Sequence, residues 1–510
     1  MQYDDIIVGA GSSGAVLASR LSEDPARSVL LLEAGPDFAT LEQTPADLRD
    51  GRAQSVVAHD WGFKALAIGD REIDYPRGKV TGGSSAVNSA VALRGVPADY
   101  DEWATMGNSE WSWSNVLPFF RKLESDRDYS GDFHGQDGPV PVKRPQRADL
   151  LPVQAGFLDA CKAAGIPECS DFNDPESTGV APWPRNIIDG VRISTAIAYL
   201  GQSRHRLNLT IRSGCLVRRV LIENGKAVGV ELESGGEVQT VYGKRITLSA
   251  GAVISPAILL RSGIGPAAQL AAFDIAQVAE LPVGETLIDH CLFPILCIPK
   301  EGVTDLDAAW QIQAGVRYTA SGSSEFNDMQ IYALSNMDFT DYPDYQALLG
   351  AQFAVGVAPG LQRPNSRGKV SLRSFDANVQ PNITLDFTED AEDMRRLVDG
   401  LRVAWKIIQQ PVFQQFIERT AILTDEMVES DEACGEYIKA TVNTIYHPTA
   451  TCRMGPDGDP GAVVDQYCRV RGINGLRVVD ASVIPSIPRA NTNLTCIMIG
   501  EKVADWMKAE

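Results

Sequence analysis

The chain has 510 residues, of which 44% are hydrophobic and 22% are charged, as in folded globular proteins and unlike disordered, collagenous or coiled-coil chains. At about 150 residues per domain, this length predicts two to four folding units. The 46 basic and 66 acidic residues give a net charge of −20. So acidic a surface disfavours nucleic acid or an anionic membrane face as a partner.

The first 33 residues predict a complete β-α-β unit. Residues 5–8 form an apolar run typical of a buried parallel strand, and residues 28–32 form a second run that ends at Glu33. Between the two runs, apolar residues follow a helical pattern at Val16, Leu17, Ala18 and Leu21, and Asp24-Pro25 ends this helix.

The turn between the first strand and the helix carries the motif GxGxxG at Gly9, Gly11 and Gly14. The first glycine allows a tight turn, the second lets a pyrophosphate approach the backbone, and the third lets helix and strand pack closely. Phosphates would then lie at a helix N-terminus, which favours anions. Glu33 would bind the ribose hydroxyls, and a carboxylate there favours FAD or NAD over NADP. A purely structural turn is the alternative interpretation of the same motif.

A second cluster of glycine and serine spans residues 76–88, PRGKVTGGSSAVN. Such a loop can bring backbone N–H groups against a flat polar ring, but the same composition also suits a flexible connector. The glycine motif by itself does not distinguish FAD from NAD.

Further strand–turn–helix patterns recur far along the chain. Residues 245–249 run into Ala250-Gly251, and residues 476–479 run into Asp480. These repeats predict an α/β fold with one doubly wound parallel sheet assembled from distant segments. The stretch 298–430 differs, with strand-like runs such as 368–372 and helical ones such as 390–409, and indicates a second domain inserted into the first.

Nine scattered cysteines, none in a CxxC pair, indicate reduced thiols and predict neither a disulfide framework nor a metal site. The N-terminus has no basic segment followed by a cleavage site, and no run of 18 apolar residues occurs. We therefore expect a cytoplasmic protein without a membrane span.

Five motifs together resemble the glucose–methanol–choline (GMC) oxidoreductases, a family of FAD-dependent alcohol oxidases and dehydrogenases. Residues 78–88 resemble the first family signature and residues 251–266 resemble the second. Residues 447–455 (HPTATCRMG), 480–482 (DAS) and 491–493 (NTN) resemble the C-terminal block of the family. The matches occur in the order of the family and extend from residue 5 to residue 505.

The resemblance implies a discontinuous FAD-binding (Rossmann-like) domain, residues 1–150, 200–297 and 431–510. It also implies an inserted α+β substrate domain built on an antiparallel sheet, residues 151–199 and 298–430. Asn88, Ser89, Ala90 and Val91 would lie against the flavin, and Val217 would contact the adenine end. The other cofactor-binding residues would be Gly9, Gly11, Ser12, Ser13, Gly14, Glu33, Ala34, Arg77, Val80, Gly83, Asp480, Ala481 and Thr492. Some relatives bond the flavin through a histidine at the position of Val87, so we expect non-covalent FAD here.

Oxidation of an alcohol requires removal of the hydroxyl proton and transfer of a hydride, which flavin N5 can accept. Only five histidines are present, and the resemblance assigns the proton to His447, with Asn491 positioning the alcohol oxygen. Asn491 also precedes a long helical pattern and is a good N-cap. The helix N-terminus there could stabilise negative charge on the reduced flavin. A core histidine and a simple cap are the alternative roles for this pair.

Three other residues are less determined. His290 falls in another family-like stretch, and we expect a structural role for it. Tyr446 is a candidate for the pocket wall. Arg489 either faces substrate, which would favour an acidic alcohol, or binds a backbone carbonyl.

The sequence therefore predicts an FAD-dependent oxidase or dehydrogenase for a primary alcohol, with O2 or another electron acceptor. Hydroxynitrile lyases and fatty-acid photodecarboxylases resemble the same family, and a non-catalytic flavoprotein is a third hypothesis. The substrate, the oxygen reactivity and the oligomeric state cannot be predicted from these patterns.

Overall fold

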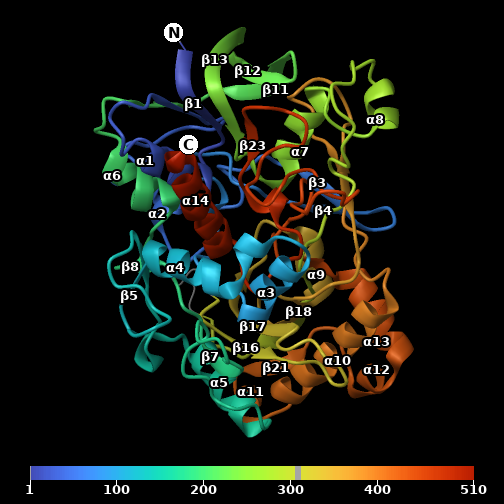
Figure 1. Ribbon diagram of the computed structural model, residues 1–510. Coiled ribbons are helices and arrows are strands. Elements are labelled where there is room, and N and C mark those ends of the chain that lie inside the picture. Colours follow the sequence, from blue (N-terminus) through green and yellow to red (C-terminus); the bar gives the residue numbers. More distant parts are fainter. Residues whose placement is uncertain (1, 305–311) are drawn as a thin grey trace.

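The computed structural model describes residues 2–304 and 312–510 (Figure 1). In this part of the chain, one sheet has the strand order β10-β2-β1-β13-β12-β11, and β23 also pairs with β13. Strands β10, β2, β1, β13 and β23 are parallel, whereas β11 and β12 are antiparallel additions at one edge. Their bounds are β1 Gln2–Val8, β2 Val29–Leu32, β10 Leu209–Arg212, β11 Leu216–Glu223, β12 Lys226–Ser234, β13 Glu237–Leu248 and β23 Leu476–Val478.

The central strands of this sheet are apolar because both faces are covered. All four residues of β2 are buried, and so are the last four of β1. Helix α1 (Gly14–Leu21) follows β1 and packs against α14 (Thr492–Ala509), the last helix of the chain. The two helices approach closely at Gly500, where a Cβ atom would lie 3.0 Å from Cβ of Val16. The predicted β-α-β unit and parallel sheet are confirmed.

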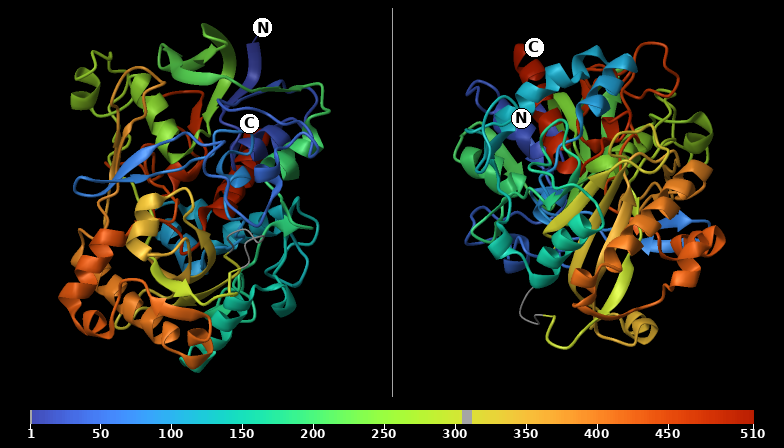
Figure 2. Two further views of the ribbon diagram at one scale, coloured as in Figure 1. Left: turned by 180° about the vertical axis from the view of Figure 1, so that it is seen from behind. Right: turned by 90° about the horizontal axis from the view of Figure 1, so that it is seen from below.

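A second sheet has the order β21-β15-β18-β17-β16-β7, with β14 and β22 attached next to β18, and its pairings are antiparallel. This confirms the predicted antiparallel sheet. Helix α10 (Ala391–Ile408) packs on β18 and β17, and Figure 2 shows it with its neighbours along one side of the sheet. The bounds are β7 Gly179–Pro182, β14 Cys291–Leu292, β15 Ile295–Pro299, β16 Ala314–Tyr318, β17 Met329–Asp338, β18 Phe353–Leu361, β21 Ile417–Thr420 and β22 Asn443–Thr444.

The two regions exchange chain segments. The second sheet takes β14 and the start of β15 from the stretch before residue 298, and β22 from the C-terminal stretch. A four-stranded sheet, β19-β20-β3-β4, joins a hairpin near the N-terminus to strands from the middle of the chain. Its bounds are β3 Lys64–Ile68, β4 Arg71–Asp74, β19 Lys369–Ser371 and β20 Asn382–Thr384.

The remaining elements surround these sheets, and both termini lie in the half that holds the first sheet (Figures 1 and 2). No helix among the described residues has the length and apolar character needed to cross a membrane. All nine cysteines are free and buried. The other strands are β5 Glu124–Asp126, β6 Val140–Val142, β8 Ile187–Ile188 and β9 Val191–Arg192. The other helices are α2 Ala46–Arg49, α3 Pro97–Thr105, α4 Trp113–Leu123, α5 Pro152–Ala163, α6 Gly201–Ser203, α7 Gly251–Arg261, α8 Ala267–Ala271, α9 Pro343–Leu349, α11 Pro411–Gln414, α12 Asp425–Glu429 and α13 Asp431–Thr441.

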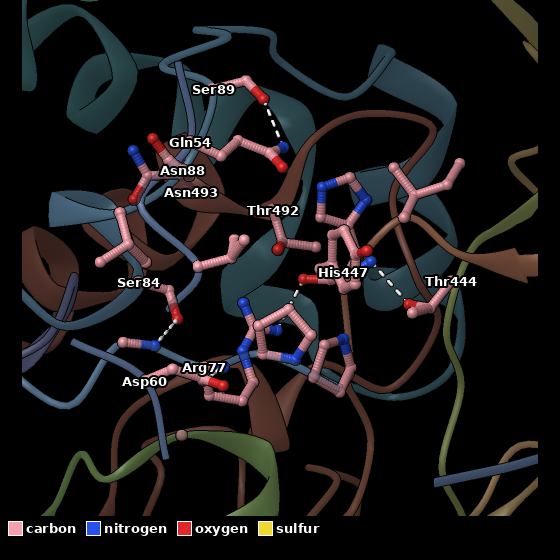
Figure 3. A pocket seen from close by; sticks show the side chains of 18 of the residues that line it. Gln54, Asp60, Arg77, Ser84, Asn88, Ser89, Thr444, His447, Thr492 and Asn493 are labelled. Carbon is pink, nitrogen blue, oxygen red and sulfur yellow. Dashed lines mark hydrogen bonds between the residues drawn. The ribbon is translucent and has the colours of Figure 1, made fainter. Parts of the chain in front are cut away.

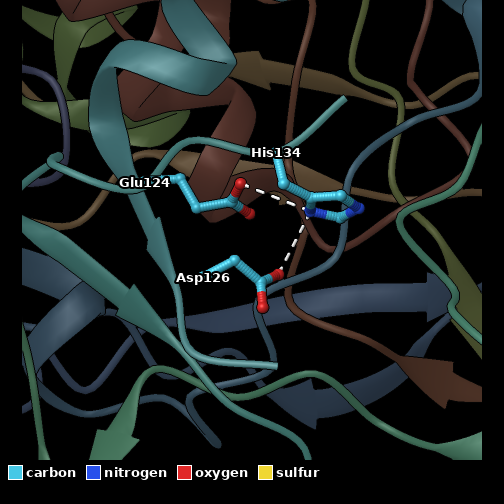
Figure 4. A group of neighbouring side chains, drawn as sticks. All are labelled: Glu124, Asp126 and His134. Carbon is cyan, nitrogen blue, oxygen red and sulfur yellow. Dashed lines mark ion pairs between the residues drawn. The ribbon is translucent and has the colours of Figure 1, made fainter. Parts of the chain in front are cut away.

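A buried ionic cluster lies beside β5. His134 Nδ1 lies 3.1 Å from Asp126 and 3.5 Å from Glu124 (Figure 4). Its Nε2 lies 3.0 Å from Asp171. Arg144 pairs with both Asp126 and Asp171, and Arg94 pairs with Glu124. Three ligand atoms here could reach one metal ion, but guanidinium groups already compensate the carboxylates. The cluster is an ion-pair network.

We expect His134 to make the stability of the fold pH-dependent. Burial lowers the pKa of His134, but hydrogen bonds with Asp126, Asp171 and Glu124 outweigh it and raise the pKa from 6.5 to about 10. The stabilisation is therefore fully present below pH 6.5 and is lost as the pH rises toward 10. Relative to wild type, His134→Gln should lose several kcal/mol at pH 6 and less at pH 10, at roughly 1.4 kcal/mol per pKa unit. Urea unfolding at pH 6, 8 and 10 measures this, and a difference independent of pH would contradict it.

Candidate active site

A cavity of ≈ 440 Å³ extends from the loop after β1 to the second sheet (Figure 3). One end is lined by the glycine-rich loop and by Glu33, and the other end by side chains of β14, β15, β17 and β18. His447 and Asn491 line the cavity as well. The region beside the glycine-rich loop and the region beside the second sheet therefore belong to one continuous cavity.

The first glycine motif adopts the geometry that its sequence predicts. Gly9 has φ = 96°, a conformation that side chains disfavour, at the turn from β1 into α1. A Cβ atom on Gly14 would lie 1.9 Å from the carbonyl oxygen of Gly9. Only glycine at position 14 therefore lets helix and strand pack this closely.

The second glycine cluster packs directly on the first. Gly82 N–H donates to the carbonyl oxygen of Ala10 at 2.8 Å. A Cβ atom on Gly83 would lie 2.7 Å from Cα of Gly11. The two loops therefore meet backbone to backbone, and together they form a wall of the cavity rather than a free connection.

Glu33 lies at the end of β2 with its carboxylate in the cavity wall. Its two oxygens accept hydrogen bonds from the N–H groups of Ala10 and Gly35, both at 2.9 Å. Burial raises the pKa of Glu33 to about 7, although the backbone hydrogen bonds oppose this shift. Each oxygen retains a lone pair for another donor, so the group can accept from two hydroxyls at once.

Glu33→Gln should weaken dinucleotide binding by roughly 10- to 100-fold, the value of one or two charge-assisted hydrogen bonds. In the Gln variant, the side-chain NH2 group also faces the N–H of Ala10 or of Gly35, and two donors cannot form a hydrogen bond with each other. Titration of the stripped protein with FAD measures the effect. Glu42→Gln, an exposed carboxyl on the next loop, is the matched control. Equal affinity of the two variants would contradict the role of Glu33.

The predicted cofactor residues divide into two groups. Four of them do not line the cavity: Gly14, Val80, Ala90 and Val217. Gly14 acts through packing, and the other three are buried side chains. Those that line it are Gly9, Gly11, Ser12, Ser13, Glu33, Ala34, Arg77, Gly83, Asn88, Ser89, Val91, Asp480, Ala481 and Thr492.

Some lining residues were not predicted. The segment 249–254, where β13 turns into α7, forms part of the wall, and the strand–turn–helix pattern there was the available signal. Gln54 donates to Ser89 at 2.6 Å (Figure 3), and Asp60 accepts from the N–H of Arg77 at 2.6 Å. Both lie in an irregular loop, where no sequence pattern marks them.

His447 and Asn491 meet in the cavity. Asn491 is the N-cap residue of α14, but its side chain makes no capping hydrogen bond. Instead, its Nδ2 lies 3.2 Å from Nε2 of His447. Its Oδ1 is buried and has no hydrogen-bond partner among the described residues. An orphaned acceptor beside a cavity indicates a place for a bound group.

A chain of hydrogen bonds assigns the protons of His447. His290 Nε2 lies 3.0 Å from the carbonyl oxygen of Gln362, which can only accept, so this nitrogen carries the hydrogen. Burial lowers the pKa of His290 to about 3, so its Nδ1 is an unprotonated acceptor. That atom lies 2.9 Å from Nδ1 of His447, which therefore donates. Nε2 of His447 is left unprotonated, and its lone pair accepts a hydrogen bond from Nδ2 of Asn491.

The charge state of His447 agrees with this assignment. Burial lowers the pKa of His447 well below 6.5, and the neighbouring His290 and Arg77 lower it further. The ring is therefore neutral near pH 7. A neutral imidazole with a fixed hydrogen on Nδ1 can accept a proton at Nε2.

The backbone around His447 is held by Asp289. The carboxylate accepts from the N–H of His447 at 2.8 Å and from the hydroxyls of Tyr75 and Thr444, both at 2.6 Å. Burial raises the pKa of Asp289 to about 6, and these hydrogen bonds oppose the shift. Tyr446, in the cavity wall, has φ = 68°, an unfavourable conformation for a bulky residue. The segment is thus held in a strained turn beside the site.

Arg489 is not part of the cavity wall. Its guanidinium donates to the carbonyl oxygen of Phe326 at 2.6 Å and pairs with Asp99 and Glu325. It therefore joins α3 to the loop before β17, in keeping with the backbone-binding alternative. His290 does not line the cavity and instead contacts His447. Its structural role is therefore to hold the ring of His447.

The chemistry of the cavity fits a flavin dinucleotide. Two glycine loops form a cradle that Cβ atoms would fill, and a buried carboxylate stands at the strand end for ribose hydroxyls. The N-terminus of α14 adds free N–H groups in the wall at Thr492 and Asn493. The arrangement can therefore bind a dinucleotide and present a proton acceptor to a neighbouring molecule.

Comparisons with known proteins agree on one family. Models of the GMC oxidoreductase family match residues 3–292 and residues 364–500. Oxygen-dependent choline dehydrogenase from Photobacterium profundum is 38% identical over 99% of this chain and 92% of its own length. A GMC-type oxidoreductase from Rhodococcus erythropolis is 35% identical over 98% of this chain and 97% of its own.

Solved structures give the same result. Pyridoxine 4-oxidase from Mesorbium loti superposes with a TM-score of 0.90 and 29% identity, with full coverage of both chains. A formate oxidase superposes with a TM-score of 0.88 and 25% identity over 100% of this chain and 98% of its own.

Proposed function

This chain belongs to the GMC oxidoreductase family, and we propose that it oxidises a primary alcohol to the aldehyde, with His447 as proton acceptor. It is an FAD-dependent oxidoreductase that acts on CH–OH groups. The observation that carries the proposal is the hydrogen-bonded chain from Gln362 through His290 to His447, which leaves Nε2 of His447 unprotonated at the cavity, beside the amide of Asn491.

FAD would be held by the residues of the two glycine loops, by Glu33 at the ribose and by the N-terminus of α14. When bound, the flavin supplies an acceptor for the hydride. Val87 has no nucleophilic atom, which supports a non-covalent cofactor. Acid precipitation of the holoenzyme should release all of the flavin into the supernatant, and flavin retained on the denatured protein would contradict this.

In this proposal, His447 and Asn491 both contact the alcohol oxygen, in different roles. Nε2 of His447 accepts the hydroxyl proton, and the amide N–H of Asn491 donates to the same oxygen and fixes its position. The 3.2 Å separation of the two side chains lets a single oxygen contact both. His290 holds the His447 ring in the tautomer that this step needs, and Asp289 holds its backbone.

We also assign the substrate region to the second sheet, since its strands β14, β15, β17 and β18 line the cavity beyond His447. In this proposal, residues 151–199 and 298–430 supply most of the substrate domain. The electron acceptor is O2 or an artificial or cellular oxidant.

The direct test mixes the purified holoenzyme with a panel of alcohols under anaerobic conditions. We expect loss of the visible absorbance of the oxidised flavin with at least one primary alcohol, and formation of the aldehyde. Parallel assays with O2 and with a dye identify the acceptor. If no alcohol bleached the flavin while the protein cleaved or decarboxylated a substrate, the chain would be a lyase or photodecarboxylase, and the proposal would fail.

A further inference from the structure

Beyond His447, the part of the cavity wall formed by β14, β15 and Pro294 between them is apolar, because alternate residues of these strands face the cavity. Along β14 and β15, the side chains of Leu292, Pro294 and Leu296 line the cavity and are half-buried. The intervening residues Cys291, Phe293 and Ile295 are buried on the other side. Because neighbouring residues of a strand point to opposite faces, one whole face of this edge presents hydrocarbon to the cavity.

The neighbouring strands continue the same face. Tyr332 pairs with Ala358, and both line the cavity. Leu334 on one side and Leu296 on the other pair with Gly356. The central strand β18 therefore carries small residues, Gly356, Ala358 and Gly360, along the face that borders the cavity. Of these three, Ala358 lines the cavity, and we call the part of the cavity between Ala358 and the larger lining residues of β14, β15 and β17 the trough.

The charges around the cavity disfavour a cation. The acidic residues that line it, Glu33, Asp60 and Asp480, all lie outside the second sheet and outside the segment 441–447. Among the described residues of β14, β15, β17 and β18, no acidic side chain lines the cavity. Next to His447, the Arg77 guanidinium donates to the carbonyl oxygen of Tyr446 at 2.6 Å. A cationic substrate would face an arginine and find no carboxylate partner among the described residues of these four strands.

The geometry points to an uncharged alcohol with an apolar alkyl or aryl body, held in the trough over Ala358, as the substrate class of this enzyme. This inference rests on the proposed function. It separates this chain from relatives that are named for choline, because a quaternary ammonium buried without a counter-charge is strongly disfavoured. Aromatic rings can also hold quaternary ammonium groups, so choline itself is the charged arm of the test.

The test compares choline with 3,3-dimethylbutan-1-ol, in which carbon replaces the charged nitrogen and the shape is unchanged. Anaerobic flavin reduction at several concentrations gives the dissociation constant and the limiting rate for each alcohol separately. We expect the neutral alcohol to have a kcat/KM at least about 10²-fold higher, mainly through tighter binding, since leaving a charge unpaired costs several kcal/mol. Equal or better use of choline would overturn the inference.

The trough is tested separately with Ala358. Ala358→Leu places a larger side chain in it and should lower kcat/KM for 3,3-dimethylbutan-1-ol by at least about 10-fold, as expected for overpacking. Ala271→Leu, the same change at an exposed alanine of α8 outside the cavity wall, is the matched control. The flavin spectrum and the thermal midpoint report whether the Ala358→Leu variant is folded. If it is not, Ala358→Gly, which removes a methyl group from the same place instead of adding bulk, is compared with wild type by the same measurement of kcat/KM. Unchanged kinetics in folded variants would overturn the placement. If only charged or strongly polar alcohols reduce the flavin, this inference fails alone; if no alcohol does, the proposed function fails.

Discussion

His447→Ala should reduce the rate of flavin reduction by an alcohol by roughly 10²–10⁴-fold, the usual contribution of a general base. The substitution removes the Nε2 lone pair, which in the proposed mechanism accepts the alcohol proton and which the chain from Gln362 through His290 keeps unprotonated. FAD should remain bound, because the glycine loops and Glu33 are untouched. Anaerobic rapid mixing with the best alcohol of the panel measures the rate directly.

The matched control for this variant is His205→Ala, which changes an exposed histidine outside the cavity wall. Its rate should equal that of wild type. If His447→Ala retained nearly full activity with normal flavin content, another group would have to be the proton acceptor. Loss of FAD from the variant would instead show that His447 supports the cofactor.

His290→Phe should lower the same rate by on the order of 10²-fold, although His290 does not reach the cavity. Without an acceptor at its Nδ1, His447 can carry its hydrogen on Nε2 and lose the lone pair that the reaction uses. In the serine-protease triad, the wrong tautomer costs about 10⁴-fold. We expect a smaller loss here, because Asp289 and Asn491 still hold His447 in place.

A purely structural role for His290 would produce a different result. In that case flavin content, thermal midpoint and substrate affinity would change together, whereas a tautomer effect confines the loss to the limiting rate. His290→Asn is the informative companion, since its amide can accept from His447 and donate to the carbonyl of Gln362. Recovery of part of the rate in this variant would support the tautomer assignment. Equal losses in both variants would refute it.

The sequence was most informative where local patterns determine geometry. The strand before Gly9, the helix after it and the carboxylate of Glu33 follow from spacing over a few dozen residues, and the structure has all three. The close packing at Gly14 was likewise predictable, because the motif itself implies it. The pairing of His447 with Asn491 was predicted only through family resemblance.

Long-range partners could not be predicted in the same way. His290 and His447 are 157 residues apart and meet only because β14 and β22 pair, a register that no local pattern specifies. The alternation on β18 was equally hidden, since strand periodicity says that two faces differ but not which one borders a cavity. The pairing of β3 with β20 joins segments that the predicted domain boundaries had kept apart.

The start of α14 illustrates a compromise between folding and catalysis. Asn is a favourable capping residue worth about 1 kcal/mol when its side chain satisfies the first-turn N–H groups, yet Asn491 gives up that bond and turns toward His447. The first turn of α14 is therefore left without a side-chain cap beside the cavity. If Asn491 positions the alcohol as proposed, a redesign for stability that restored a side-chain cap at this position would lower turnover.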